Sequence, residues 1–188
     1  MFQRGASHKT VGIPINDYGS MEPFEGEYYA GFFGWKDDVR RDFGSSDPDE
    51  PFMPGWNAYS EYLTSELINP LVKGKTYEVV FRVALSQNSD RSILGLGTHF
   101  SRVPVNENHR KFLEHVPDVY LKEMVKEKGK WIEVRGKFKS LGGERYIVLG
   151  VFPYVGLESM NLIEGHDNRY AYYYIDGISL MEVVEEVE

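Results

Sequence analysis

The side chains that could act in catalysis are plentiful in this 188-residue sequence, but their spacing selects no mechanism. Two carboxylates at a set separation can cleave a glycosidic bond, and the acids available for such a pair are scattered: Glu27, Asp37, Glu61, Glu144 and Glu164. The five histidines and the many serines form no local signature such as a nucleophile elbow. The absence of cysteine excludes a cysteine nucleophile, a disulfide and a thiolate metal site. We therefore expect a protein that is not an enzyme.

Metal-binding patterns are equally weak. His109 and His115 are six residues apart, which fits no regular zinc spacing on a helix. His166 and Asp167 lie in the stretch "EGHDN", which is typical of a turn. A long polar stretch offers oxygen ligands for calcium, but their order does not match an EF-hand loop: Asp37, Asp38, Asp42, Asp47 and Asp49. The sequence therefore predicts a solvated, charged loop over residues 36–55 and no required cofactor.

Aromatic residues next to expected loops could bind sugar. A pyranose stacks on a flat ring, while polar groups around that ring hydrogen-bond the hydroxyls. Six residues suit this role: Trp35, Tyr29, Phe33, Trp56, Tyr154 and Tyr170. We rank Trp35 first, because it ends an aromatic strand and precedes the charged loop. The alternative is that these rings belong to the core, as we expect of Trp131 and Tyr77, since half of the side chains of a strand face inward.

Composition and charge limit the class of protein. The chain is 41% hydrophobic and 14% aromatic, with 19 glycines, which favours one globular, all-β domain over residues 1–188. Its net charge of -8 opposes nucleic acid, which binds to basic surfaces. No stretch approaches the roughly 20 apolar residues of a membrane span. The first residues also lack the apolar centre of a signal peptide, although an exported protein loses that segment on maturation.

Alternating patterns place the strands. Tyr77, Val79, Phe81, Val83 and Leu85 alternate with mainly polar residues, which predicts a strand with one buried face. Further strands are expected over 27–35, 59–67, 93–101, 131–140, 144–152 and 172–181, giving about eight antiparallel strands. Residues 1–26 are expected to be irregular, and residues 102–130 to form a loop with one or two helical turns. Residues 184–188 are interpreted as the start of a linker or tail.

The order of these stretches resembles a known fold family. "EYLTSELINPLVKGKTYEVVFRVALSQNSD", "GLGTHFS", "KGKWIEVRGKFKSLGGERYIVLGVF" and "YYYIDGISL" resemble the galactose-binding-like jelly-roll domain of carbohydrate-binding modules. The early stretch "VGIPINDYGSMEPFEGEYYAGFF" is similar to a branch fused to OmpA-like proteins of the Gram-negative cell envelope. The resemblance covers nearly the whole chain and implies a jelly-roll β-sandwich.

Two departures from the family bear on calcium. Members usually begin with an extra strand, and nothing before Phe2 supplies it, which suggests a piece of a larger polypeptide. Their last strand usually reads Tyr-Ile-Asp-Asp, whereas Gly177 stands here after Asp176. In related modules a late aspartate helps to hold a structural calcium ion. Asp176 is therefore the candidate metal ligand, and Tyr174, Ile175 and Ile178 are expected to contribute to the core.

These observations give two alternative functions. The first is a non-catalytic carbohydrate-binding or adhesion module of an exported protein, periplasmic or at the cell surface and associated with the outer membrane, whose partner is a glycan or envelope polymer. The second is a structural domain that binds another envelope protein without recognising sugar. The position of the aromatic rings discriminates between them, because sugar binding needs exposed rings on one surface.

Overall fold

The computed structural model describes residues 1–7, 9–37, 58–107, 112–153, 159–161 and 170–184. In this part of the chain every regular element is a β-strand, which confirms the expected all-β class. The described residues contain no helix that could span a membrane.

The larger sheet has seven strands and contains the longest strand among the described residues. Its order is β12 (Ile132–Lys139), β8 (Thr76–Leu85), β15 (Tyr170–Glu182), β5 (Tyr28–Asp37), β1 (Phe2–Arg4) and β2 (Gly12–Ile13), with β6 (Ala58–Tyr59) also paired to β5. All its pairings are antiparallel except that of β1 with β2.

The smaller sheet has four strands, in the order β11 (Val119–Tyr120), β10 (Leu96–Ser101), β13 (Tyr146–Val151) and β7 (Leu63–Glu66). Two short pairs lie outside the main sheets: β9 (Arg91–Ile93) with β14 (Ser159–Asn161), and β3 (Ile15–Asn16) with β4 (Gly19–Ser20). Along the described chain, β5, β7, β8, β10, β12, β13 and β15 belong alternately to the larger and the smaller sheet. This alternation builds the expected jelly-roll sandwich.

The main core fills the space between the two sheets. Val79, Phe81 and Val83 of β8 and Leu149 and Val151 of β13 are among its buried residues. The period-two pattern of β8 therefore predicted its buried face correctly. Val80, which broke the polar series, is also buried.

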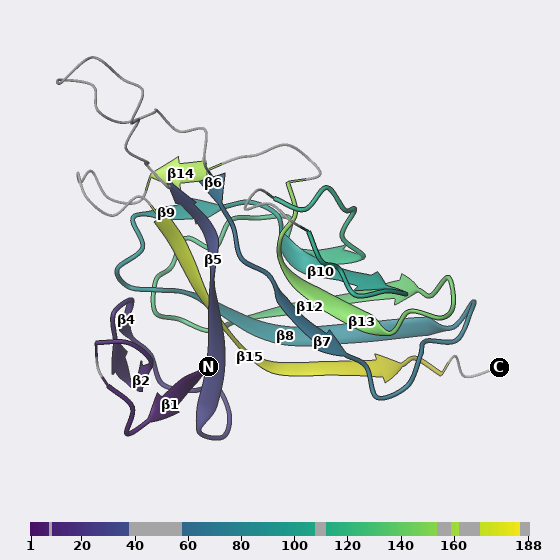
Figure 1. Cartoon of the computed structure of the whole chain (residues 1–188), viewed down its shortest axis with the longest axis horizontal. Helices are drawn as coiled ribbons and strands as arrows, with labels where there is room; N and C mark the ends of the chain where they lie inside the picture. Colours follow the sequence, from purple (N-terminus) through teal and green to yellow (C-terminus); the bar gives the residue numbers. More distant parts are fainter. Residues whose placement is uncertain (8, 38–57, 108–111, 154–158, 162–169, 185–188) are drawn as a thin grey trace, which may run out of the picture.

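A second core lies on the outer face of the larger sheet. Phe2 and Met21 of the N-terminal segment pack there against Tyr29, Tyr172 and Tyr174. Figure 1 shows β1, β2 and β4 gathered on one side of the molecule, next to β5 and far from the C-terminal end of β15. Residues 1–26 thus pack on this domain, and the short strands they form were not evident from their sequence.

A buried hydrogen-bond network joins this segment to the sheet. Asn16, 5% exposed, accepts from the Tyr174 hydroxyl through Oδ1 (2.7 Å) and donates to the Tyr29 hydroxyl through Nδ2 (3.2 Å). The Tyr29 hydroxyl donates in turn to the Met21 carbonyl (3.1 Å). Because buried polar groups are costly unless they are paired, these bonds specify how the segment lies on the sheet.

The structure corrects two expectations. Residues 102–107 and 112–130 form no helical turn; the segment that contains Pro117 instead delivers β11 to the edge of β10. Ile178 was expected in the core and is 48% exposed. The register of β15 on β8 shifts between Asp176 and Ser179, and β5 pairs with β15 only as far as Ile175, so Ile178 lies where no further strand covers it.

Candidate functional site

Four aromatic side chains form a continuous surface on the outer face of the larger sheet. We define this surface, made of Tyr18, Phe33, Tyr59 and Tyr170, as the aromatic patch. All four are partly exposed, and Phe33 lies at its centre, with ring centroids 5.5 Å from Tyr18, 5.7 Å from Tyr170 and 5.9 Å from Tyr59. The three contacts are edge-to-face, so the rings present differently oriented faces and edges.

The patch has a rigid base. Tyr172, 5% exposed, lies beneath it, with its ring stacked on that of Tyr18 at 3.6 Å and edge-to-face with Phe33 at 4.9 Å. Tyr170 and Tyr172 have the same orientation on β15, while Ala171 and Tyr173 belong to the main core. Because side chains alternate between the two faces of β15, Tyr173 lies in the main core, whereas Tyr170 lies in the aromatic patch and Tyr172 beneath it.

Polar groups surround these rings. Glu61 accepts from the Phe33 backbone N–H (2.9 Å) and from the Tyr59 hydroxyl (2.5 Å). Asp90 accepts from the Tyr170 backbone N–H (2.8 Å). The ammonium of Lys36 lies 5.2 Å from the centre of the Phe33 ring. Acids, an amine and phenol hydroxyls therefore lie beside apolar ring surface, which is the combination that sugar binding needs.

Burial and negative charge both act on the tyrosines of the patch. Burial raises the pKa of Tyr18, and the charges of Glu61 and Asp17 raise it further. Burial also raises the pKa of Tyr170 to about 12, with Tyr18, Asp90 and Asp17 adding to the effect. These phenols are neutral at physiological pH, so each can donate a hydrogen bond as well as accept one.

The predicted sugar-binding residues do not all lie on this patch. Phe33 and Tyr170 do. Tyr29 is 3% exposed and covered by Phe2, whose ring stacks on it at 5.0 Å, so its ring is not available to a ligand in this structure. Trp35 is partly exposed, but it packs against the main core and the Arg91 guanidinium lies 4.8 Å from its ring centre. Trp56 and Tyr154 lie outside the described residues.

Tyr18 and Tyr59 were not among the sugar-binding residues expected from the sequence, and Glu61 was named only as an acid available for glycosidic cleavage. Tyr59 and Glu61 are two residues apart at a short strand, a spacing that places side chains on the same face. Tyr18 could not be found in this way, because it belongs to a segment that was expected to be irregular. Its position depends on contacts between distant parts of the chain, including the hydrogen bond from Asn88 N–H to its carbonyl (3.0 Å).

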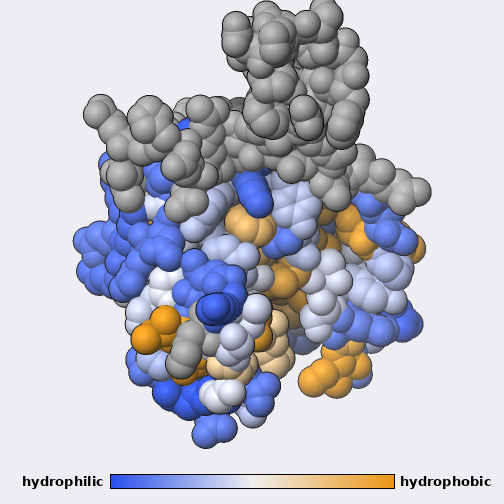
Figure 2. Space-filling view, turned by 60° about the vertical axis from the view of Figure 1, so that its left-hand side comes forward, coloured by the Kyte–Doolittle hydropathy of each residue, from blue (hydrophilic) through white to orange (hydrophobic). Residues whose placement is uncertain are grey.

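Figure 2 shows the side of the molecule that carries the N-terminal strands, where hydrophobic side chains form separate patches among hydrophilic ones.

Tyr77 lies in the main core, as expected. Trp131 is only partly buried, at the border of the outer core, and its indole N–H donates to the Glu22 carbonyl (2.9 Å). It therefore anchors the N-terminal segment.

Asp176, the candidate calcium ligand, is occupied by backbone donors. Its Oδ2 accepts from the N–H groups of Phe24 (2.8 Å) and Glu25 (3.2 Å), and its Oδ1 from that of Gly177 (2.8 Å). Gly177 has φ +59°, a conformation that favours glycine. The described residues contain no group of three or more histidines or acids that could hold a metal ion. In this structure Asp176 ties the N-terminal segment to the last strand.

The acids considered for glycosidic cleavage are not brought together among the described residues. Glu144, 6% exposed, accepts from the Ser140 hydroxyl (2.6 Å) and the Leu141 N–H (2.8 Å) in the turn between β12 and β13. Although burial raises the pKa of Glu144, these bonds and those from Gly142 lower it below its usual value overall. Glu61 belongs to the aromatic patch, and Glu27 is exposed. The Asp37 side chain and Glu164 lie outside the described part.

Two histidines form a separate feature on the smaller sheet. The rings of His99 and His115 stack at 4.7 Å, and Nδ1 of His99 lies 3.0 Å from the Val116 carbonyl and 3.5 Å from Asp118 Oδ2. The hydrogen bond to Asp118 raises the pKa of His99. His109 and His166 lie outside the described residues.

Comparisons with known proteins identify no family. No protein-family model matches the sequence, and no curated protein matches it significantly. The fold is similar to the CBM22-1 xylan-binding domain from Paenibacillus barcinonensis Xyn10C, with a TM-score of 0.39 and 16% identity over 86% of this chain and 88% of that one. It is also similar to the K1 cleaved adhesin domain of Lys-gingipain from Porphyromonas gingivalis W83, with a TM-score of 0.32 and 11% identity over 82% of this chain and 98% of that one. Likenesses at this level assign no ligand to this chain.

Proposed function

We propose that this chain is a non-catalytic carbohydrate-binding module, and that its ligand lies on the aromatic patch. The observation that carries the proposal is the continuity of four partly exposed rings on one face, with Glu61 hydrogen-bonded at their border. The C–H face of a pyranose would contact the rings. Its hydroxyls would bond to the Glu61 carboxylate and to the phenols beside the rings.

The rigidity of the patch supports binding of a polymer with many hydroxyls. The Tyr18 ring stacks on that of Tyr172, and the Tyr18 backbone carbonyl accepts from the Asn88 N–H. Little side-chain entropy is therefore lost when a ligand contacts this ring. The patch is also partly exposed rather than enclosed, which allows a long chain to pass over it. We include in the proposal the address implied by the family resemblance: an exported, envelope-associated or adhesive module of a Gram-negative bacterium.

A glycan array tests this function. We expect the chain to bind a subset of glycans, and Tyr170→Ala to weaken that binding about tenfold or more, because one stacking surface is lost. The matched control is Tyr28→Ala, since Tyr28 lies on β5, is 44% exposed and belongs to neither the patch nor the outer core. Thermal unfolding of both variants checks that the fold is retained.

Two results would oppose the proposal. One is an array that is silent throughout, including plant, bacterial and host glycans. The other is an equal loss of binding in Tyr28→Ala and Tyr170→Ala, which would place the ligand elsewhere.

A further inference from the structure

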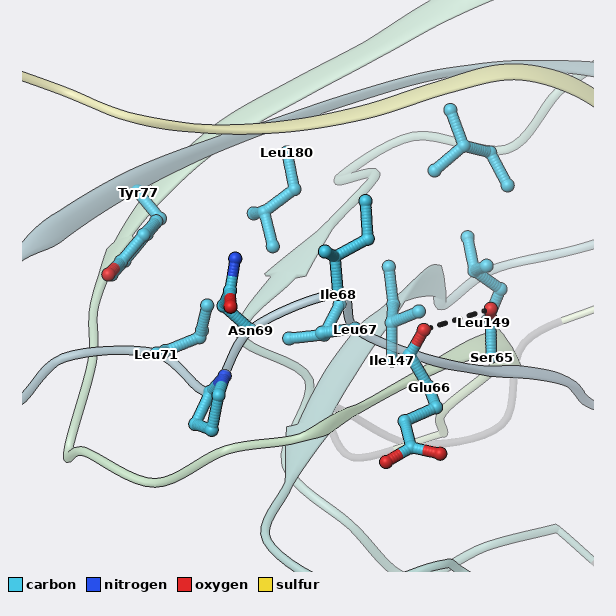
Figure 3. A pocket seen from close by; sticks show the side chains of 12 residues that line it. Ser65, Glu66, Leu67, Ile68, Asn69, Leu71, Tyr77, Ile147, Leu149 and Leu180 are labelled. Atoms are coloured by element: carbon cyan, nitrogen blue, oxygen red, sulfur yellow. Dashed lines mark hydrogen bonds between the residues drawn. The ribbon is translucent and has the colours of Figure 1, made fainter.

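An apolar groove of about 580 Å³ opens at one edge of the sandwich, away from the aromatic patch. One wall carries Leu67 and Ile68 after β7, the other carries Ile178 and Leu180 of β15, and Ile147 and Leu149 of β13 also line it. Figure 3 shows the side chains of Leu67 and Leu180 directed into the space between the walls, while Ile68, 99% exposed, lies at its rim. The groove is thus an uncovered part of the space between the two sheets.

Both walls are sheet edges. After Ile175, β15 is paired with β8 alone, because the pairing with β5 ends at Ile175 and Ala30. The Val183 N–H donates to the carbonyl of Thr76, the first residue of β8. Because the backbone groups of successive residues of a strand point to alternate sides, those of Leu180 and Glu182 point away from β8. On the opposite wall, β7 pairs with β13 alone in the described structure. An extended chain could bond to either edge.

The open edge of β15 carries charge at its two ends, Asp176 and Glu182, but its middle lacks the charges that usually prevent such pairing. At the other end of the larger sheet, the edge strand β12 carries four charges: Glu133, Arg135, Lys137 and Lys139. Residues 178–181 of β15 carry none. Ile68 and Ile178 are 99% and 48% exposed on the two walls. Natural sheets protect edges with charge, and exposed apolar patches mark interaction sites, so this edge has the character of a docking surface.

Charge indicates the kind of occupant. Glu66 is the single charged residue among those that line the groove, but its carboxylate is directed away from the apolar side chains, as Figure 3 shows, so the interior of the groove is uncharged. The chain as a whole carries -8, which opposes the approach of a second copy. A segment with basic residues at its ends would complement this net charge.

We propose that this groove binds an extended, apolar peptide segment of another protein, which adds a strand to β15 and carries basic residues at its ends. Alternate side chains of the segment enter the groove, and its backbone bonds to the open groups at Leu180 and Glu182. This site is independent of the aromatic patch, so it adds a protein partner to the proposed glycan ligand.

The test measures binding of a labelled peptide in which valine and threonine alternate between terminal arginines. Fluorescence anisotropy gives the affinity for the full chain, and hydrogen exchange gives the protected amides. We expect protection at residues 178–182. A peptide with alternate amides N-methylated should not bind, because it lacks the backbone donors. One with terminal glutamates should bind more weakly, because its charge has the same sign as the net charge of -8 of the chain.

Variants locate the site. Ile68→Glu and Ile178→Glu place a charge in the apolar groove and should weaken binding about tenfold or more. Both side chains are exposed, so the fold should be retained. Val103→Glu is the matched control, because Val103 is 66% exposed and does not line the groove.

Several outcomes overturn the proposal: no binding at about 1 mM peptide, equal affinity of the basic and acidic peptides, or equal loss in Val103→Glu. Self-association that Ile178→Glu abolishes would also overturn it, because the occupant would then be a second copy of this chain. Glycan binding is measured separately, so failure here leaves the aromatic patch unaffected.

Discussion

The tyrosines of the last strand show how much a single residue's role depends on which face it takes. Tyr173 is fully buried in the main core, and its hydroxyl accepts from the Ile93 N–H (2.9 Å). Tyr172 lies under the aromatic patch and Tyr170 on it. The sequence identifies these residues as a strand, but the ring that a ligand can reach is decided by what the rest of the chain covers.

Ionisation of Tyr170 should make the stability of the fold depend on pH. Its pKa is raised to about 12 from the ordinary value of 10.0, so it favours folding below pH 10 and loses that contribution as pH rises toward 12. We expect the thermal midpoint to fall over this range, and to fall less in Tyr170→Phe, which cannot ionise. Tyr28→Phe serves as the control. Midpoint curves for wild type and Tyr170→Phe with the same pH dependence would contradict the prediction.

At the element scale, alternation predicted the long strands well and the short ones poorly. The patterns of β8 and β12 are local, and a buried face suffices to reveal them. The outward position of Ile178 was not predictable, because it follows from a register shift and from where β5 ends. The packing of residues 1–26 depends in the same way on distant partners such as Asn16 and Tyr174.

Asp176 should stabilise the attachment of the N-terminal segment to β15. Asp176→Ala removes the acceptor of the backbone N–H groups of Phe24, Glu25 and Gly177. We expect a loss of about 1–3 kcal/mol in the free energy of unfolding, because charge-assisted bonds are lost. Hydrogen exchange at residues 24 and 25 should become faster. Glu27→Ala, an exposed acid near the same segment, is the control.

A chelator distinguishes this role from the calcium alternative. If Asp176 acts through backbone donors, removal of divalent cations leaves the unfolding midpoint of the wild type unchanged. A midpoint that drops with chelator and recovers with calcium would instead assign Asp176 to an ion site.

On the scale of the whole molecule, the two surfaces belong to opposite parts of the larger sheet. The aromatic patch lies on its outer face, where β5, β6 and β15 meet, and the groove lies at the edge that β15 forms after β5 ends. A sandwich of this kind could hold a glycan on one surface and a protein on the other. The sequence predicted the sandwich and two residues of the patch, Phe33 and Tyr170. It did not predict the groove, because a groove is a gap between strands.

Sugar binding at the aromatic patch is tested by a map of NMR chemical-shift changes across the full chain when soluble polysaccharides and peptidoglycan fragments are added. We expect the largest changes at Tyr18, Phe33 and Tyr170, and no changes at Ile68 and Ile178. Changes centred on the groove, or no change with any of these glycans, would contradict this expectation.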